Sequence, residues 1–531
     1  MTQYLDRLHR QSRITVYAIN QFAKRRALAY AVLFILPLIF QGLTFIRFGI
    51  PYPFSHDELA NYLQADILLD GHIAEPALPF PEHFETFHVL VTPVYTAKYP
   101  IGHAVILALG KLLTGHHQWG IVLEIALCCV AMMWAARACV GPAWSFLAGF
   151  SVFLIFGTSN YWVRSAWGGG LIFLASLLLI GGYLRTIRMG EKSATILFAC
   201  GLAAAFFSRP FEGGLLALTL IPFFVIGVLR SRDRNRILVP ALVAIAVIGI
   251  ATLWVQIKID LTVTGRAATL PYQLHSSQYT AMPSWWFLPA DSSPKLGGKE
   301  LTKGRDWEMD FWRNARALGP LKMIWKNVNS VDRILSDSTA NTMFMFSLSL
   351  LVGTSLTRYL WLLGLPIYAG LLAETSHMSH YAAPLIAVML ILKFQLASRL
   401  STLRKGSLKV GVTFSLLWVL FSMAAPIRSG ASAFLTPPTV SVQRRVQLQL
   451  KDSPGKHLIF VRREGDFAHH YDPVYNAPNL QNADVIWARD LSPDKNQRLI
   501  DYFPNRQVWL CLPDRIEKDP SLPLLQSYEG Q

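Results

Sequence analysis

The chain has 531 residues, of which 52% are hydrophobic and only 15% are charged. This composition excludes an intrinsically disordered chain and is too apolar for a string of ordinary soluble domains. Four of the five cysteines lie within apolar runs, which excludes a disulfide scaffold. The 49 Lys and Arg against 33 Asp and Glu give a net charge of +16. In a membrane protein this excess belongs to cytoplasmic loops and anionic headgroups, so we expect no nucleic acid partner.

Eleven apolar windows are long enough to cross a bilayer, which needs about 20 apolar residues, or fewer where polar ends snorkel. The sequence therefore predicts a polytopic α-helical membrane protein. A twelfth run, 99–113, is short and interrupted by Pro100, Gly102 and Lys111, so we expect a juxtamembrane helix there. The predicted crossings are 28–46, 119–137, 142–158, 168–184, 193–207, 213–229, 237–257, 341–354, 358–374, 380–397 and 408–426.

The charge pattern orients these crossings. Residues 1–27 hold six Lys and Arg against the single acid Asp6, which keeps the N-terminus in the cytoplasm. No small-residue cleavage site follows the first apolar run, so we do not expect a cleaved signal peptide. A transmembrane domain over 28–426 then has outer loops at 47–118 and 258–340, and places 427–531 outside the cytoplasm. We expect a multi-pass protein of the inner (plasma) membrane.

The tail 427–531 is no longer membrane-like in composition. Short β-type runs at Leu458–Arg462, Asp484–Trp487 and Gln507–Leu512 alternate with a helical pattern around Pro493–Tyr502. This alternation predicts a small extracytoplasmic α/β domain.

Two short motifs in the first outer loop contain the main candidate functional residues. Asp57 and Glu58 open a run with apolar residues at helical spacing, where acids suit a helix N-terminus. The simpler alternative is that Asp57 caps the helix and Glu58 is a solvated acid of its first turn. Further on, Lys98 and Tyr99 bring a cation and a phenol to headgroup depth, where a lysine can hold a phosphate. An ordinary snorkelling lysine beside an interfacial tyrosine is the alternative there.

The order of these motifs resembles a known superfamily. The pattern D-E-x3-Y-x2-A begins at Asp57, L-L-D-G-H follows at 68–72, and K-Y-P-I-G at 98–102. Together they resemble the GT-C integral-membrane glycosyltransferases, most of all the branch of protein O-mannosyltransferases and the bacterial enzyme that adds aminoarabinose to lipid A. The resemblance implies transfer of a sugar from a polyprenyl-phosphate donor to an extracytoplasmic glycan, lipid or protein. It also implies that Asp57 is the catalytic acid residue, with Glu58 beside it, and that Lys98 contacts the carrier phosphate.

The chemistry that this resemblance implies needs only a few side chains. An inverting transfer needs one carboxylate to take the acceptor proton, and cations to absorb the charge of the leaving phosphate. A lipid donor needs no nucleotide loop, and neither a GxGxxG nor a P-loop stands between a strand and a helix in this chain. The segment 159–167 lacks the second acid that some relatives carry, so a divalent metal remains an open question, with Glu58 or His56 as its ligand.

Later outer segments offer further candidates. Arg209 precedes a crossing and requires water, an anion or its neighbour Glu212. We expect it, with Lys98 and Tyr99, to bind donor phosphate, and pairing with Glu212 is the alternative. The acceptor or sugar candidates are Arg266 and Tyr272, in a segment expected to cover the site, together with His380 and Tyr381. His377 and His380 could instead share a metal, although interfacial histidines more often bond to loops or headgroups.

Other functions compete with the transferase. A transporter or flippase of an anionic lipid or solute suits many crossings and a basic face, and Glu124 and Lys393 lie within predicted crossings. Transporters place most ionisable groups near the bilayer midplane, whereas this chain concentrates its polar residues in outer loops. A lipid-linked polymerase or ligase and a noncatalytic scaffold are the remaining alternatives.

Overall fold

The structure is a computed structural model of the whole chain. The residues that it describes, to which every statement about contacts refers, are 2–158, 161–231, 234–336, 339–376, 378–404, 410–435, 440–463, 472–514 and 524–528.

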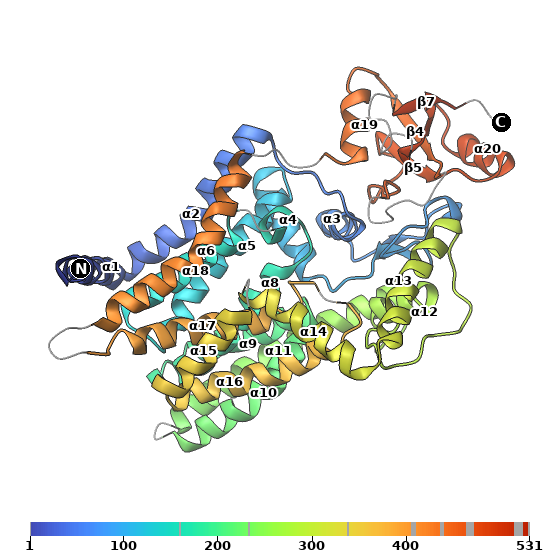
Figure 1. Ribbon diagram of the computed structural model, residues 1–531. Coiled ribbons are helices and arrows are strands. Elements are labelled where there is room, and N and C mark those ends of the chain that lie inside the picture. Colours follow the sequence, from blue (N-terminus) through green and yellow to red (C-terminus); the bar gives the residue numbers. More distant parts are fainter. Residues whose placement is uncertain are drawn as a thin grey trace.

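Helices occupy every predicted crossing, which confirms the polytopic α-helical class (Figure 1). Within the described part of the chain, eight helices are long and apolar enough to span a bilayer, and four shorter helices are apolar as well. The long helices are α2 (Arg26–Phe48), α5 (Gln118–Ala136), α8 (Gly169–Met189), α10 (Pro210–Arg230), α11 (Arg234–Thr264), α16 (Ser355–Ala373), α17 (Ala383–Leu400) and α18 (Val410–Leu435). The shorter ones are α4 (Gly102–Thr114), α6 (Pro142–Phe156), α9 (Ala194–Phe206) and α15 (Thr339–Val352).

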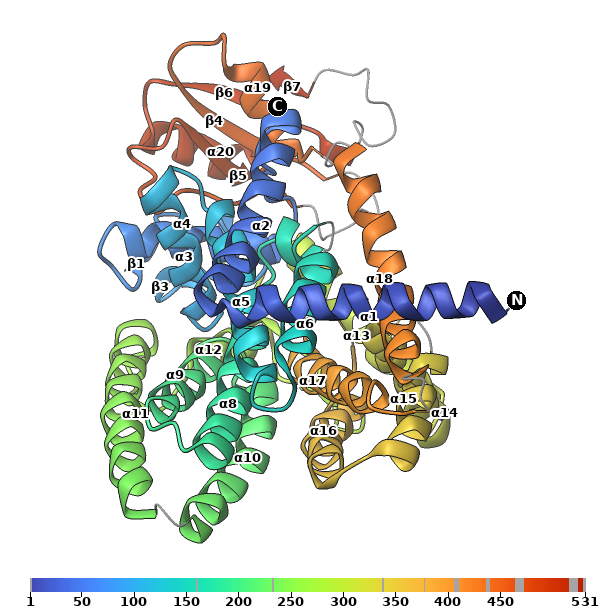
Figure 2. The ribbon, with the colours of Figure 1, turned by 90° about the vertical axis from the view of Figure 1, so that its left-hand side faces the viewer.

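The basic N-terminal segment is a helix that the apolar windows did not predict. Helix α1 (Thr2–Lys24) packs on α6 and α18, and Figure 2 shows it lying across α18. His9 on its buried side makes a 2.9 Å hydrogen bond to Thr413 Oγ1 of α18. A search for continuous apolar runs misses such a helix because only one of its faces is apolar.

The first outer loop folds into a compact layer above the bundle. It contains α3 (His56–Leu69), the 3-10 helix η1 (Pro81–His83) and α4. A small antiparallel sheet in the order β1-β3-β2 joins them, formed by β1 (Glu75–Pro76), β2 (Val89–Leu90) and β3 (Val94–Ala97). Lys98 therefore stands directly after β3, and His88 directly before β2.

The second large outer loop is mostly helical. It forms α12 (Pro271–Tyr279), α13 (Lys299–Ala317) and α14 (Pro320–Ser336). The segment between α12 and α13 is irregular and ends at two glycines, after which α13 begins at Lys299. Trp286 Nε1 donates to the Leu372 carbonyl over 3.0 Å, which fixes this irregular part to the end of α16.

The tail is an α/β domain, as the sequence predicted. Its sheet has the order β5-β4-β6-β7, with β7 alone antiparallel to its neighbour. The strands are β4 (Lys456–Val461), β5 (Val485–Arg489), β6 (Arg506–Cys511) and β7 (Leu525–Ser527), and the helices are α19 (Val442–Leu450) and α20 (Pro493–Tyr502). Helix α18 runs past the expected boundary at 426 and ends at Leu435, so the domain starts later than predicted.

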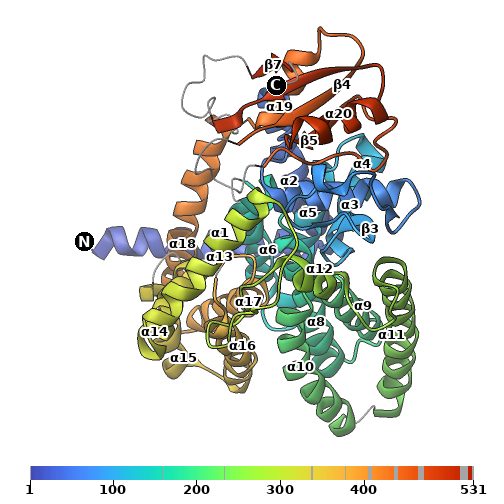
Figure 3. The same cartoon turned by 90° about the vertical axis from the view of Figure 1, so that its right-hand side faces the viewer.

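The tail domain and the first outer loop share one hydrophobic core. Leu59 and Phe84 of the loop are buried with Leu458 and Phe460 of β4. Figure 3 shows the tail domain lying over α3 and β3. The Tyr475 hydroxyl donates to the Phe87 carbonyl over 2.6 Å, so the tail holds the chain next to His88.

Candidate functional site

The start of α3 is anchored by Glu58. Its Oε2 accepts hydrogen bonds of 3.1 Å from the backbone amides of Phe54 and Ser55, and its Oε1 accepts one of 3.0 Å from the Ala166 amide. The side chain is buried, and burial raises its pKa. These bonds form a capping box and tie α3 to the segment before α8. We therefore assign Glu58 a positioning role in place of the catalytic role expected from the sequence.

Asp57 is the neighbour of Glu58 but makes different contacts. Its side chain is 33% exposed. His56 Nδ1 lies 3.0 Å from Oδ2, His88 Nε2 lies 3.6 Å from Oδ1, and the Tyr99 hydroxyl donates a hydrogen bond to Oδ1. Burial opposes ionisation, but the two imidazoles and the phenol outweigh it and hold the pKa of the Asp57 carboxyl well below its usual range. Asp57 is therefore an ionised carboxylate at neutral pH.

His88 was not among the residues predicted from the sequence. Its backbone has a φ of +64°, a conformation that few side-chain-bearing residues adopt. Its carbonyl accepts a 3.0 Å hydrogen bond from the Lys98 amide, because Val89 pairs with Ala97 in the hairpin. Burial, together with the charge of Lys98, lowers the pKa of His88 well below its usual value, and the Asp57 carboxylate partly offsets this shift. The only sequence signal was a histidine ten positions before Lys98.

Lys98 is a nearly buried cation, with 9% of its surface exposed. Its ammonium lies 5.3 Å from the ring centroid of Tyr99 and 5.1 Å from that of Tyr272. Among the described residues, no carboxylate lies within ion-pair distance of Lys98. A buried charge without a counter-ion is costly, which favours a bound anion. Tyr272 is 43% exposed and forms the outer wall beside this ammonium.

Two residues of the second outer loop also reach this site, and sequence reasoning missed both. Burial and the charge of Lys98 lower the pKa of His275 in α12. Burial raises the pKa of Glu308 in α13, on which the charges of Lys98 and Asp57 also act. Both residues are more than 170 positions from Lys98 in the sequence, so no local motif indicates them.

Arg209 joins the site from the start of α10. Its Nη1 lies 3.1 Å from Glu212 Oε1, which is the pairing considered as the alternative, and its guanidinium carbon lies 4.5 Å from the ring centroid of Tyr381. Burial raises the pKa of Tyr381, and the charges of both Arg209 and Asp57 act on that phenol. The structure therefore places Arg209 against Tyr381 near the Asp57 site, and the binding roles expected of both remain predictions.

Gly102 of the K-Y-P-I-G motif explains how Arg209 is placed. The Gly102 amide donates to the Phe207 carbonyl over 2.8 Å, and a Cβ at this position would lie 2.6 Å from that oxygen. Only glycine permits this close approach. The contact holds the segment after Lys98 against the segment before Arg209.

Three other candidates have different outcomes. His380 is buried, and its Nδ1 lies 2.9 Å from the Tyr161 hydroxyl, so it fixes the segment before α8 to the start of α17. The Arg266 side chain is exposed and makes no hydrogen bond or ion pair with any described residue, so the structure does not bring it to the site. His377 lies outside the described residues.

Among the residues that the structure describes, one group of side chains could hold a metal ion. The ligand atoms of His56, Asp57 and His88 all lie within 4.8 Å of one another. Two imidazoles and a carboxylate form a three-ligand set typical of zinc with an open position. Of the two ligands that the sequence indicated, His56 belongs to this group and Glu58 does not.

Comparison with known proteins gives structural matches only. No protein-family model and no curated protein sequence matches the chain. ArnT, the lipid A aminoarabinose transferase, from Cupriavidus metallidurans bound to undecaprenyl phosphate, superposes with a TM-score of 0.53 and 13% identity, over 94% of this chain and 96% of ArnT. Its apo form gives a TM-score of 0.51 and 13% identity over 93% and 95%. The oligosaccharyltransferase of Archaeoglobus fulgidus, in complex with zinc and sulfate, gives 0.49 and 9% identity over 90% and 68%.

The likeness to ArnT extends over nearly the whole of both chains, including the tail domain. At 13% identity it is a likeness of fold. It agrees with the three motifs of the first outer loop, which come from the sequence alone. The protein therefore has the fold of the GT-C membrane glycosyltransferases.

Proposed function

We propose that this protein is a membrane glycosyltransferase that moves a sugar from a polyprenyl-phosphate donor to an acceptor outside the cytoplasm. The observation that carries the proposal is that the ionised Asp57 shares one site with Lys98, a buried cation with no carboxylate partner among the described residues. A base and a phosphate-binding cation are the two groups that an inverting transfer requires. The undecaprenyl phosphate bound to ArnT, which has the same fold, supports a polyprenyl-phosphate donor.

The proposed reaction is a single displacement. Asp57 accepts the proton of the acceptor hydroxyl while the acceptor oxygen forms a bond to the anomeric carbon of the sugar. The bond between that carbon and the phosphate oxygen breaks, and polyprenyl phosphate leaves. Attack from the face opposite the phosphate inverts the anomeric configuration.

The cations act on the leaving group. Lys98 and Arg209 offset the negative charge that develops on the phosphate, and the low exposure of Lys98 strengthens this interaction because little water screens it. The Glu212 carboxylate keeps Arg209 in place from one side only, which leaves further guanidinium donors for an anion. Tyr272 and Tyr381 supply aromatic faces on which a sugar ring can stack.

The transporter alternative has less support. Glu124 is buried, with Oε1 3.7 Å from His103 Nδ1. Lys393 Nζ lies 2.5 Å from Ser422 Oγ of α18. Each is therefore packed against another helix, and the distribution of charge gives no reason to prefer transport.

The test compares cells that lack the gene with cells that carry variants of it. We expect loss of the gene to remove one sugar from an envelope glycan, lipid or protein, and to cause the unused polyprenyl-phosphate sugar to accumulate, both measured by mass spectrometry. The wild-type gene should restore the product, and Asp57→Asn should not, although it inserts into the membrane normally. Asp70→Asn is the matched control, because Asp70 is an exposed acid at the other end of α3. Full product from Asp57→Asn would remove Asp57 from its proposed role.

A further inference from the structure

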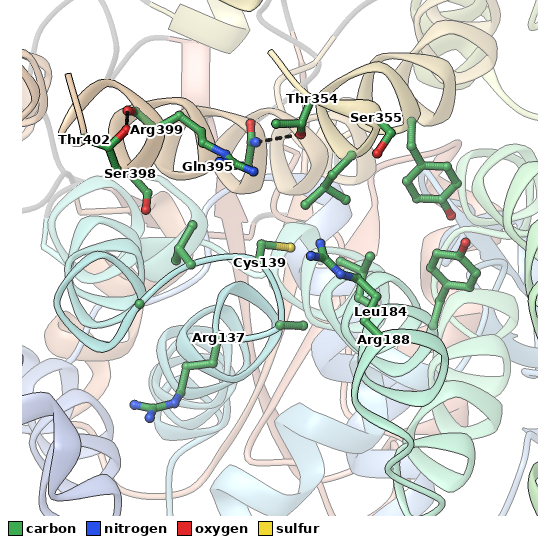
Figure 4. Close-up of a pocket in the computed structure, with 16 residues that line it drawn as sticks. Arg137, Cys139, Leu184, Arg188, Thr354, Ser355, Gln395, Ser398, Arg399 and Thr402 are labelled. Carbon is green, nitrogen blue, oxygen red and sulfur yellow. Dashed lines mark hydrogen bonds between the residues drawn. The ribbon is translucent and has the colours of Figure 1, made fainter. Parts of the chain in front are cut away.

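A polar cavity, drawn in Figure 4, lies at the last turns of α8 and α17. Helix α8 runs from the segment beside the Asp57 site to this cavity. It begins two residues after Trp167, whose indole donates to Ser55 beside Asp57, and it ends at Met189 near the cavity. Its 21 residues correspond to roughly 30 Å, which is about the thickness of the hydrocarbon core. The cavity is therefore separate from the proposed transferase site and faces the opposite headgroup layer.

The ends of four elements enclose this cavity, whose volume is about 760 Å³. They are the turn between α5 and α6, the last turns of α8 and α17, and the start of α16. This volume lies within the range of small-molecule sites and exceeds the size of a single inorganic phosphate.

The charge of the lining is entirely positive. Arg137, Arg188 and Arg399 line the cavity, and no Asp or Glu does so among the described residues. Arg137 Nη1 is occupied by the Ala23 carbonyl at 3.0 Å. Figure 4 shows Arg188 and Arg399 extending into the cavity from α8 and α17.

Arg185, which lies on the same helix as Arg188, differs from both of these arginines. Arg185 makes two hydrogen bonds to Glu191, of 2.6 and 2.7 Å, and so has its counter-ion within the protein. Arg188 and Arg399 form no ion pair with any residue in the described ranges. Two guanidinium groups that converge on one space without an acid repel each other unless an anion lies between them.

Neutral donors complete the lining. The side chains of Ser355 and Ser398 offer hydroxyl groups, whereas the Thr402 hydroxyl already donates to the Arg399 carbonyl over 2.7 Å. Gln395 Nε2 donates to Thr354 Oγ1 over 3.2 Å. Thr354 is the N-cap of α16, so the positive end of this helix dipole also faces the cavity. Guanidinium groups, hydroxyls and a helix N-terminus are together the donors that recognise phosphate.

We propose that this cavity binds an anionic phosphate group, through Arg188 and Arg399. The group belongs either to the headgroup of an anionic phospholipid in that leaflet or to a soluble phosphate compound. The site is additional to the transferase site and does not depend on it.

The test uses the purified full chain and two probes. In the first arm, native mass spectrometry measures retention of dioleoylphosphatidylglycerol against dioleoylphosphatidylcholine. In the second arm, thermal unfolding is compared in inorganic phosphate and in chloride of equal ionic strength. We expect Arg188→Gln/Arg399→Gln to lower the affinity for one of the two probes at least tenfold. Both arginines are exposed, so the substitutions remove charge without opening the core.

The matched control is Arg230→Gln, an exposed arginine in the last turn of α10 that does not line the cavity. Loss of phosphatidylglycerol retention in the double variant, with retention kept in the control, assigns the cavity to a lipid headgroup. Loss of the phosphate-dependent stabilisation assigns it to a soluble phosphate compound. The proposal is wrong if the double variant equals the wild type in both arms, or if the control loses binding to the same extent.

Discussion

The Tyr99 hydroxyl donates a hydrogen bond to Oδ1 of Asp57, and this bond joins two motifs that are 42 positions apart. It brings the phenol of K-Y-P-I-G to the carboxylate of the D-E pair. Since Lys98 is the residue before Tyr99, the same bond fixes the separation between the proposed base and the proposed phosphate-binding cation. Tyr99 is therefore a positioning residue as well as a donor that stabilises the ionised form of Asp57.

Replacing this donor should change the pH dependence of the reaction. In the proposed reaction Asp57 is an ionised base, so activity should fall as the pH decreases through its pKa. The Tyr99 hydrogen bond lowers that pKa, and Tyr99→Phe should raise it, which moves the acid limb of the kcat/KM profile to higher pH. The measurement is the pH profile of kcat/KM for both proteins. An acid limb at the same pH in both would show that the hydrogen bond does not act on the catalytic base.

Removing the buried cation should weaken use of the donor. A hydrogen bond to a charged group contributes about 1.5–3 kcal/mol, so Lys98→Ala should weaken polyprenyl-phosphate binding roughly 10- to 150-fold. The measurement is the affinity for the carrier lipid together with KM for the donor. Lys111→Ala is the control, because Lys111 pairs with Asp66 in the same outer loop at 2.7 Å. Unchanged binding and turnover in Lys98→Ala would restore the interpretation of Lys98 as a snorkelling lysine.

The sequence predicted the elements whose pattern is local. Proline and periodic apolar residues marked α20 at Pro493–Tyr502, and continuous apolar runs marked the crossings. Helix α1 was not predicted, because its apolar residues occupy one face only. Asp57, Lys98 and Tyr99 were identified because they lie in short motifs of one loop. These elements depend on residues that are close together in the sequence, so one sequence is enough to predict them.

The rest of the site depends on contacts that a sequence does not display. The role of Glu58 follows from the Ala166 amide, and any residue type can offer a backbone amide. His88 faces Asp57 because Tyr475, almost 390 positions later, holds the carbonyl of Phe87. The positive charge of Arg266 suits an anion, but the backbone turns at the end of α11 and leaves this side chain exposed.

The group formed by His56, Asp57 and His88 makes a prediction about metal. The chelator-treated protein should bind one zinc ion, and His88→Gln should weaken that binding at least tenfold, as measured by calorimetry, because it removes one of three ligands. His72→Gln is the control, since His72 is an exposed histidine of the same loop that pairs with Glu75. Equal zinc affinity for both variants and the wild type would exclude this group as a metal site.

The buried ion pair of Arg489 and Asp472 should stabilise the attachment of the tail domain to the first outer loop. Arg489 is almost fully buried, donates to Asp472 Oδ1 at 3.0 Å and also donates to the Glu85 carbonyl of the first outer loop. Arg489→Ala leaves the buried Asp472 carboxylate with the Val474 amide but without its cationic partner, and should cost about 3–5 kcal/mol. Hydrogen exchange of the β4 and β5 amides measures this loss. Arg313→Ala breaks an exposed pair with Asp310 and should cost about 0–1 kcal/mol, so equal exchange in the two variants would contradict the assignment.

The orientation of the bundle can be tested at the two ends of α11. Its 31 residues correspond to roughly 45 Å, so Arg234 and the irregular segment around Ala290 should lie on opposite sides of the membrane. The positive charge of the loops predicts that Arg234 lies in the cytoplasm. In a chain with Cys139 and Cys200 replaced by Ser, we expect an impermeant maleimide to label Ala290→Cys in intact cells and to label Arg234→Cys only after permeabilisation. Labelling of Arg234→Cys alone in intact cells would reverse the orientation and place Asp57 on the cytoplasmic face, where the proposed acceptor is absent.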